Sequence, residues 1–294
     1  LGVALIIILS TLDSSNGQIG DVKIIYVLLL PVAANLLVRG MGAIFIRNIP
    51  PWVSAFFWVS LAIGSITVAT LALLRVNAAL LPLTYDAYLY KIDAAYGGVA
   101  QWVARWYGDG NHASGKIIFY VYELLGFLLF PLIALLIREN KITAMHGWRS
   151  IVLPYAIAVL CYAWLPATGP GPSLPGYPNN ISPMDIASGM ASVGASPRNA
   201  MPSFHLSSAI WIMMLMAALR RKWMFALSIV FLIGTALATL ALGEHYFIDL
   251  VVALPFAAAV GLFLMNPPKW QRAGALAKSM QWLALLTFVV WMSL

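Results

Sequence analysis

Apolar stretches separated by short polar segments recur along almost the whole chain. A helix needs about 20 apolar residues to cross the hydrocarbon layer of a bilayer, and several of these stretches reach or approach that length. Counting the apolar fragment that opens the chain, this window argument predicts about nine spans. The pattern therefore predicts an all-α fold, a polytopic integral membrane bundle of helices. Besides that opening fragment, the expected spans are Lys23–Phe45, Val53–Leu74, Lys116–Ile137, Ile151–Leu165, Ser203–Leu219, Trp223–Leu242, Tyr246–Met265 and Met280–Leu294.

The composition supports a membrane protein and argues against several other classes. Apolar residues make up 62% of the chain and charged residues 9%, which leaves too little polar surface to cover a water-soluble globule. The formal net charge is +7, but the basic residues lie in short clusters between apolar runs, so we expect no nucleic-acid partner. The single cysteine, Cys161, excludes an intrachain disulfide and a thiolate metal cluster.

The positions of the charged residues also predict an orientation. If the helices simply alternate, the basic clusters fall on one side, which should be cytoplasmic, and most aspartates fall on the other. Two polar runs, Pro202–His205 and Gly243–Asp249, then share the non-cytoplasmic face and are joined by one helical hairpin. The basic clusters are Arg138–Lys141, His146–Arg149, Arg220–Lys222 and Lys269–Arg272, and the aspartates are Asp13, Asp21, Asp86, Asp93, Asp109 and Asp185.

Two long stretches on the outer side are not expected to span. Pro82–His112 mixes aromatic and charged residues, which is typical of helices in the interfacial zone, and we expect Asp86 and Asp93 to cap helices there. Ala167–Met201 is rich in Gly, Pro, Ser and Asn and predicts an ordered, irregular loop, and loops of this length are usually functional. We divide the chain into residues 1–112 with N-terminal transmembrane and outer-face interfacial helices, a catalytic core at 113–266, and a cytoplasmic loop with a C-terminal transmembrane helix at 267–294.

The run Gly243–Asp249 contains a histidine and an aspartate at helical spacing. On a helix that starts near Tyr246, His245 and Asp249 are four residues apart and lie on the same face. Asp249 can accept a hydrogen bond from one ring nitrogen, which leaves the other nitrogen with an outward lone pair. That arrangement is what a histidine nucleophile requires.

The run Pro202–His205 has the character of a helix start. Pro202 suits the first helical position, Ser203 is a favourable cap, and the free amides of a first helical turn form an anion site. His205 lies in the same turn and could protonate an oxygen that leaves an anion bound there. Together the two runs predict a nucleophile, a group that orients it, a proton donor and a phosphate cradle.

Structural explanations compete with this chemistry. A single histidine near a membrane interface is more often a hydrogen-bonded structural group than a catalyst. Two histidines and one or two carboxylates could also hold zinc, but His-x-x-x-Asp is a weak signal without cysteines, so we expect no metal site. The combination of both runs on one face favours catalysis, because ionisable groups at the start of a span, such as Asp249, are usually functional.

The two runs resemble the signatures of a known family. Ala200–His205 resembles the second signature of the type-2 phosphatidic acid phosphatase superfamily, and Gly243–Asp249 resembles the third. The forms Asn-Ala-Met-Pro-Ser-Phe-His and Gly-Glu-His-Tyr-x-x-Asp are similar to the branch that includes inositol phosphorylceramide synthases, the target of aureobasidin, and their bacterial relatives. The resemblance extends from Lys116 to Met265. It implies a six-helix core, here with additional N-terminal and C-terminal helices, and a mechanism that uses neither metal nor cofactor.

The resemblance also assigns roles to four residues. His245 would be the nucleophile that becomes a phosphohistidine, and Asp249 would be its partner. His205 would act first as general acid and then as general base. Ser203 would be a phosphate ligand.

The sequence departs from the phosphatase pattern in its cationic residues. The family's first signature, a lysine separated by six residues from Arg-Pro, is not found, and the corresponding loop contains Thr168–Pro172 instead. The arginine that normally precedes the third-signature histidine by six positions is replaced by Thr239. The inositol-phosphotransferase branch is similar in lacking these cations. A phosphodiester carries less charge than a monoester and needs fewer cations to hold it.

Other charged residues on the same side are candidate substrate ligands. Arg198 is a candidate phosphate or headgroup contact, the alternative being a solvated loop charge. Lys116 and His112 are weaker candidates, since a lysine at a helix end commonly extends to the interface. Glu123 lies inside a span and either bonds to a neighbouring helix or faces the cavity. Glu244 flanks the nucleophile and could tune it or bind a sugar hydroxyl.

These observations predict a metal-independent membrane enzyme. We expect it to transfer a phosphate-bearing headgroup, inositol phosphate or a similar polar head, from a phospholipid donor to the hydroxyl of a lipid or sugar. The alternative is a lipid phosphatase that releases phosphate from phosphatidic acid or a polyprenyl (di)phosphate, with water as acceptor. A transporter is a second alternative, although transporter sites usually lie near the bilayer midplane. The active site is expected on the periplasmic or lumenal face, and the oligomeric state is left open.

Overall fold

The protein is described by a computed structural model of the chain. The structure describes residues 72–108, 113–139, 144–187, 196–264 and 274–293, together with residues 66, 69, 70, 191, 192 and 194. The expected span at Lys23–Phe45 and most of that at Val53–Leu74 lie outside the described residues. Outside them also lie the candidate His112, the aspartates Asp13, Asp21 and Asp109, and the basic cluster Lys269–Arg272.

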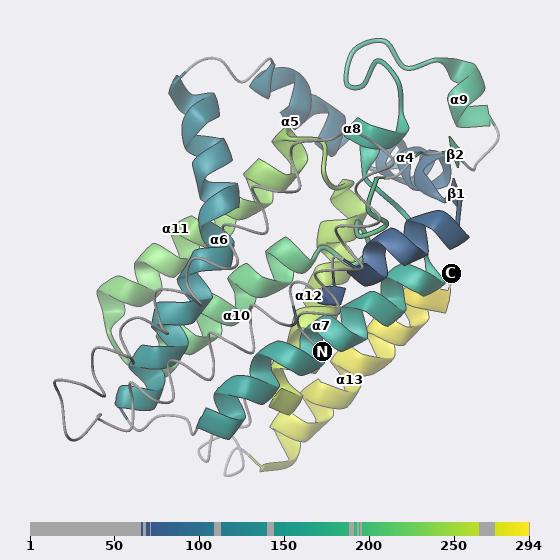
Figure 1. The fold of residues 1–294 in the computed structure, drawn as a ribbon. Coiled ribbons are helices and arrows are strands. Elements are labelled where there is room, and N and C mark those ends of the chain that lie inside the picture. Colours follow the sequence, from purple (N-terminus) through teal and green to yellow (C-terminus); the bar gives the residue numbers. More distant parts are fainter. Residues whose placement is uncertain are drawn as a thin grey trace, which may run out of the picture.

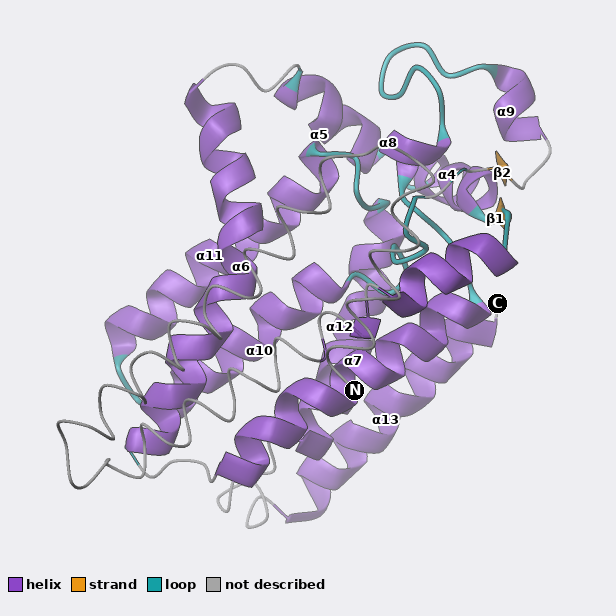
Figure 2. Cartoon of the chain, viewed as in Figure 1, coloured by secondary structure: helices purple, strands orange, loops and turns teal. Residues whose placement is uncertain are grey.

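The described chain is mostly helical (Figures 1 and 2). One pair of two-residue strands departs from the expected all-α fold, with Leu83 opposite Ser192 and Thr84 opposite Ala191 in an antiparallel ladder. This ladder joins the two stretches that were not expected to span, Pro82–His112 and Ala167–Met201. In chain order the elements are β1 (Leu83–Thr84), α4 (Asp86–Ala95), α5 (Val99–Tyr107), α6 (Ala113–Arg138), α7 (Ala144–Trp164), α8 (Pro170–Ser173), α9 (Pro183–Ala187), β2 (Ala191–Ser192), α10 (Phe204–Ala218), α11 (Lys222–Ala241), α12 (Phe247–Leu264) and α13 (Gly274–Ser293).

Six long helices match the six expected spans that fall in the described region. Helices α6, α10, α11 and α12 cover the predicted stretches with small shifts at their ends, whereas α7 begins at Ala144 and α13 at Gly274, each several residues earlier than expected. The hairpin between α10 and α11 turns at Arg220, which adopts a left-handed conformation with φ 57°. Arg221 in the same turn forms a 2.6 Å ion pair with Glu139 at the end of α6.

Helix α10 lies at the centre of the bundle, where it packs against α6, α11 and α12 (Figure 1). Helix α12 in turn packs against α7 and α13. The indole of Trp211 on α10 donates a 2.9 Å hydrogen bond to the main-chain carbonyl of Ala257 on α12. Gly261 lies beneath the same ring and permits this close approach, because a Cβ there would lie 3.0 Å from the Trp211 ring.

The short elements gather at one end of the bundle (Figures 1 and 2). Helix α5 packs on α11, while α4 packs on α8, α9 and α12. The stretch expected to hold interfacial helices therefore contains α4 and α5, and the long irregular loop contains α8, α9 and β2. The division of the chain at residue 113 stays a prediction, although α4 and α5 contact the helices of the proposed core.

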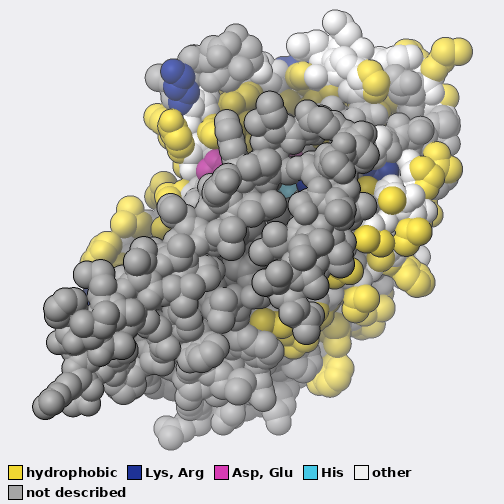
Figure 3. All heavy atoms as spheres, in the orientation of Figure 1, with side chains coloured by type: hydrophobic (Ala, Val, Ile, Leu, Met, Phe, Trp, Pro, Cys, Tyr) yellow, Lys and Arg dark blue, Asp and Glu magenta, His cyan; other side chains and the backbone are white. Residues whose placement is uncertain are grey.

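Apolar side chains cover much of the described outer surface (Figure 3). Trp223 at the start of α11 is 63% exposed, and Trp282 on α13 is exposed to the same extent. Among the described residues, only α11 is both long and apolar enough to cross a membrane by itself, whereas parts of α7, α10 and α12 form shorter apolar helices. The polytopic arrangement remains a prediction. Exposed apolar residues on α11 and α13 include Leu227, Val230, Ile233, Leu283, Leu286 and Val289.

The contact between Trp211 and Gly261 predicts a position that does not tolerate a larger residue. Gly261→Ala should destabilise the protein by about 1–3 kcal/mol, because the added methyl group overpacks the α10–α12 interface. The unfolding temperature in detergent measures this effect. Gly194→Ala is the matched control, since no atom lies within 4 Å of a Cβ placed there. Equal unfolding temperatures for the two variants would contradict the packing described above.

Candidate active site

His245 and Asp249 meet at the start of α12. Nδ1 of His245 lies 3.4 Å from Oδ2 of Asp249, and both side chains are buried. This distance is longer than a normal hydrogen bond, and in the described part of the chain His245 Nδ1 and Asp249 Oδ1 have no hydrogen-bond partner. Catalytic hydrogen bonds often tighten only when substrate binds, so the pair has the geometry of an imidazole and the carboxylate that orients it.

The local structure around this pair differs from the predicted helical face. Helix α12 begins at Phe247, so His245 precedes the helix and does not lie on its surface. Asp249, in the first turn, accepts a 2.8 Å hydrogen bond from the main-chain N–H of Tyr246. A carboxylate at this position commonly bonds back to the residue before the helix, as in a capping box. The cap, rather than helical periodicity, turns the chain so that His245 faces Asp249.

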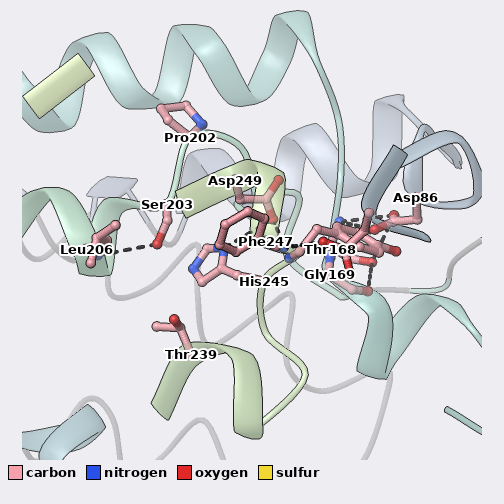
Figure 4. Close-up of polar contacts among 12 residues, drawn as sticks. Asp86, Thr168, Gly169, Pro202, Ser203, Leu206, Thr239, His245, Phe247 and Asp249 are labelled. Atoms are coloured by element: carbon pink, nitrogen blue, oxygen red, sulfur yellow. Dashed lines mark hydrogen bonds and ion pairs between the residues drawn. The ribbon is translucent and has the colours of Figure 1, made fainter. Parts of the chain in front are cut away.

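The second run forms the start of α10. Ser203 is the N-cap, and its hydroxyl accepts a 3.3 Å hydrogen bond from the N–H of Leu206. Pro202 therefore lies before the helix and not at its first position. The N–H of Ser203 donates to the main-chain carbonyl of Asp249 at 3.3 Å, which joins the two runs directly. Figure 4 shows Ser203, His245 and Asp249 gathered in one place.

His205 follows the cap and lies beside His245. The centroids of the two imidazole rings are 5.9 Å apart, and the rings are inclined by 64°. On its other side His205 stacks on the ring of Tyr122 from α6, with centroids 4.2 Å apart and planes 22° apart. The amides of the first turn of α10 lack helical acceptors, as at every helix start, and they accompany His205 at this position.

Asp86 anchors the irregular loop to α4. Its carboxylate is fully buried and accepts hydrogen bonds from the N–H of Thr168 at 3.0 and 3.1 Å and from the N–H of Gly169 at 2.9 Å. The hydroxyl of Thr168 donates a further bond of 3.1 Å. Burial raises the pKa of Asp86, and the hydrogen bonds, including one with Thr84, oppose that rise. Figure 4 shows this group of contacts beside the histidine site.

The anchored loop rests on the chain segment that precedes His245. The N–H of Gly171 donates a 2.8 Å hydrogen bond to the carbonyl of Gly243. Gly169 adopts φ 92° and ψ 161°, and a Cβ there would lie 2.2 Å from the carbonyl oxygen of Glu244. Glycine is therefore required for the backbones to approach so closely. In this chain the segment Thr168–Pro172, which stands where the basic first signature is expected, supports the histidine loop through its backbone.

Asp93 performs a second anchoring function from the same helix. Its carboxylate is buried and accepts a 2.9 Å hydrogen bond from the N–H of Phe247, the first residue of α12. Burial raises the pKa of Asp93, and the bond from Phe247 opposes the rise. The sequence predicts Asp93 to be a cap, and the structure adds that it caps a helix more than 150 residues away in the chain.

Glu244 and Thr239 lie close to His245 but differ in what they offer. Burial raises the pKa of Glu244, while the neighbouring His245 lowers it, so the carboxyl group is coupled to the proposed nucleophile. Thr239 is buried, and its hydroxyl donates to the carbonyl of Ala236 at 3.0 Å (Figure 4). A short hydroxyl therefore occupies the position where the resemblance predicts an arginine.

The guanidinium of Arg198 is hydrogen-bonded to main-chain carbonyls. Its side chain is fully buried, and Nε, Nη1 and Nη2 all donate to main-chain carbonyls. A guanidinium has five N–H donors, and five such contacts are present. A phosphate contact through Arg198 would require some of these bonds to break. The acceptors are the carbonyls of Ala78, Leu81, Gly194 and Ser196.

The two remaining candidates on α6 are exposed. Lys116 lies in the first turn of α6, and Glu123 lies one residue after Tyr122. The side chain of Glu123 is exposed, and its expected position at the cavity or against a neighbouring helix stays a prediction. In the described part of the chain, no three His, Cys, Asp or Glu side chains are grouped to hold a metal ion.

A family model of the PAP2 superfamily matches residues 87–263, which is more than half of the chain. The chain belongs to the PAP2 superfamily. Members of this superfamily are phosphatases or phosphotransferases, so this membership supports an enzyme over a transporter. The PAP2 match begins within α4 and ends within α12, so it includes α4 and α5, which the sequence analysis grouped with the N-terminal region. No curated protein and no solved structure matches the chain.

Three residues that matter in this PAP2 site were not predicted to be part of it. Tyr122 is adjacent to Glu123 in an apolar run, and two consecutive polar residues in a span were a signal that the run borders a site. Asp86 and Asp93 are seven residues apart, and this spacing places both on one face of α4. Their partners come from distant segments, and no local pattern in the sequence identifies those partners.

The close contact at Gly169 predicts that a methyl group there disrupts the site. Gly169→Ala should destabilise the protein by about 1–3 kcal/mol, because its backbone conformation is open almost only to glycine. The displaced loop should also lower turnover at least tenfold. Unfolding temperature and activity of the purified protein measure the two effects, with Gly194→Ala as the control. A Gly169→Ala protein with normal turnover would show that the loop does not support the site.

The buried carboxylate of Asp86 predicts a pH dependence of stability. Its pKa is higher in the folded protein than the ordinary value of 3.8, so folding favours the protonated form. This contribution is full below pH 3.8 and is lost as the pH rises through the folded pKa. The unfolding temperature of wild type should therefore fall as the pH rises from about 4 to about 7, and Asp86→Asn should make this fall smaller. Glu123→Gln, a change at an exposed carboxylate, should leave the fall unchanged, and equal slopes for wild type and Asp86→Asn would contradict this account.

Proposed function

We propose that this PAP2 protein transfers a phosphate-bearing headgroup from a phospholipid to a hydroxyl acceptor through a phosphohistidine at His245. The contact between His245 and Asp249, with His205 beside it, carries the proposal. In the first step Nε2 of His245 attacks phosphorus while Asp249 stabilises the charge that develops on the ring. The bond from phosphorus to the lipid oxygen breaks, and His205 donates a proton to that oxygen.

The second step reverses these roles. The hydroxyl of a second lipid or of a sugar enters, and His205 removes its proton as a general base. The resulting oxygen attacks phosphorus, and the bond to His245 breaks. Ser203 and the first-turn amides of α10 provide the site for the phosphoryl oxygens. Neither step requires a metal ion or a cofactor.

The small number of cations among the described residues near His245 favours transfer of a phosphodiester over hydrolysis of a monoester. Thr239 occupies the place of one arginine, and Thr168–Pro172 occupies the place of the basic first signature. The guanidinium of Arg198 already binds carbonyls. A monoester with nearly two negative charges would be poorly neutralised here, whereas a diester carries one. Inositol phosphate or a similar polar head is the moved group, and Glu244 is a candidate ligand for its hydroxyl groups.

The proposed enzyme is an integral membrane protein whose substrates reach it from the bilayer. One apolar helix of spanning length and membership of the superfamily suggest membrane association. The exposed apolar surfaces of α11 and α13 support the remaining spans, since lipid can cover them. The basic turn at Arg220–Lys222 lies at the opposite end of α11 from His245, which favours a non-cytoplasmic active site.

His245→Ala should abolish transfer, because the variant has no atom to form the covalent intermediate. The assay mixes purified protein with vesicles that contain phosphatidylinositol and ceramide, and phosphorus NMR separates a new phosphodiester from free phosphate. Wild type should form the diester, and a brief pulse with labelled donor should leave acid-labile, base-stable label on the protein.

Asn180→Ala, in an exposed part of the irregular loop, is the control and should act like wild type. Turnover by a folded His245→Ala protein would rule out the nucleophile. No diester from these vesicles, together with release of free phosphate from a second set that contains phosphatidic acid, would establish the phosphatase alternative.

A further inference from the structure

Tyr122 contacts His205, one of the two proposed catalytic histidines, although neither signature run includes it. It lies in α6, more than 80 residues before His205 in the chain, and its ring stacks on His205 at a centroid distance of 4.2 Å. The stacking contact places the tyrosine beside the candidate site. The rings of Tyr122, His205 and His245 thus form a row from α6 to the loop before α12.

The stack restricts the orientation of the His205 ring. The bond between Cβ and an imidazole ring rotates in a broad energy well, so a histidine at a helix start does not by itself hold its ring plane. A neighbouring aromatic ring inclined by only 22° removes most of that freedom. The plane of His205 is then set by α6, and its N–H groups point along this plane.

The orientation matters because proton transfer depends on direction. A general acid must place its proton within hydrogen-bond reach of the departing oxygen. His205 lies at 64° to His245, an edge-to-face arrangement in which a change of its ring plane would turn its nitrogens relative to the nucleophile. The lipid oxygen leaves phosphorus in a defined direction when His245 attacks. The ring plane of His205 therefore determines whether its proton reaches that oxygen.

We propose that Tyr122 is a positioning residue that fixes the ring plane of His205, through the face of its ring and not through its hydroxyl. The inference rests on the proposed role of His205 as general acid. It adds a third segment of the chain, α6, to the machinery that the two signature runs supply.

The test compares two donors that differ in their need for an acid. Dihexanoyl phosphatidylinositol releases an alkoxide oxygen and needs a proton, whereas inositol 4-nitrophenyl phosphate releases a stable phenolate and does not. Tyr122→Leu keeps a similar volume without an aromatic face. It should lower turnover of the lipid donor about 10- to 100-fold, a part of the general-acid contribution, and turnover of the nitrophenyl donor less than about threefold.

Two further variants separate stacking from other effects. Tyr122→Phe keeps the ring and loses the hydroxyl, so it should retain both activities within about twofold. Tyr120→Leu makes the same change on an exposed side chain of α6 and should also resemble wild type. Loss of both activities in Tyr122→Phe would overturn the proposal, because the hydroxyl would then be the essential group.

A spectroscopic measurement tests the contact without turnover. The Tyr122 ring current should shift the imidazole proton resonances of His205 upfield in wild type and in Tyr122→Phe, and this shift should vanish in Tyr122→Leu. His205→Ala identifies the resonance. An unchanged resonance in a folded Tyr122→Leu protein would overturn the inference.

The same assay distinguishes this inference from the proposed function. His205→Ala should lose much more activity toward the lipid donor than toward the nitrophenyl donor. If it loses both equally or loses neither, the general-acid role fails and this inference fails with it. If His205→Ala discriminates between the donors but Tyr122→Leu loses both equally or neither, only the positioning role of Tyr122 fails.

Discussion

The buried amino termini of α10 and α12 impose the constraint on which the site depends. The first amides of a helix have no partner within it, and in a buried setting each must be satisfied by another group. Here the partners come from the site itself. Asp249 accepts from Tyr246 through its side chain and from Ser203 through its carbonyl, while Asp93 accepts from Phe247. The hydrogen bonds that complete the two helix starts therefore also hold the two histidine-bearing segments together.

The anchoring of the irregular loop follows the same logic. The carboxylate of Asp86 accepts hydrogen bonds from the N–H groups of Thr168 and Gly169. The loop held in this way lies against the backbone that leads to His245. The resemblance drawn from the sequence predicts a basic first signature in this region. In this chain the region supplies backbone contacts and a glycine that permits them.

Much of the bundle can be predicted from the chain because its signals are local. Apolar length identifies the six described long helices, and the basic turn at Arg220–Lys222 predicts the α10–α11 hairpin. The motif spacing identifies His205, His245 and Asp249 as neighbours. The side that each helix buries cannot be predicted in the same way, because a helix that is apolar on all sides has no stripe that shows which side is buried. The side chain of Glu123, for example, is exposed in the structure, and the apolar run around it does not predict that exposure.

The sequence by itself determined the class of fold, the positions of the long helices and the identity of the chemical groups, since these depend on composition and short spacing. Tertiary structure alone decided which distant residues serve those groups. Three kinds of contact depend on the rotation and packing of the helices. They are the stacking of Tyr122 on His205, the hydrogen bonds to Asp86 and Asp93, and the hydrogen bonds from Arg198 to main-chain carbonyls. Partners so far apart in the chain leave no periodic trace, so only the folded protein places them.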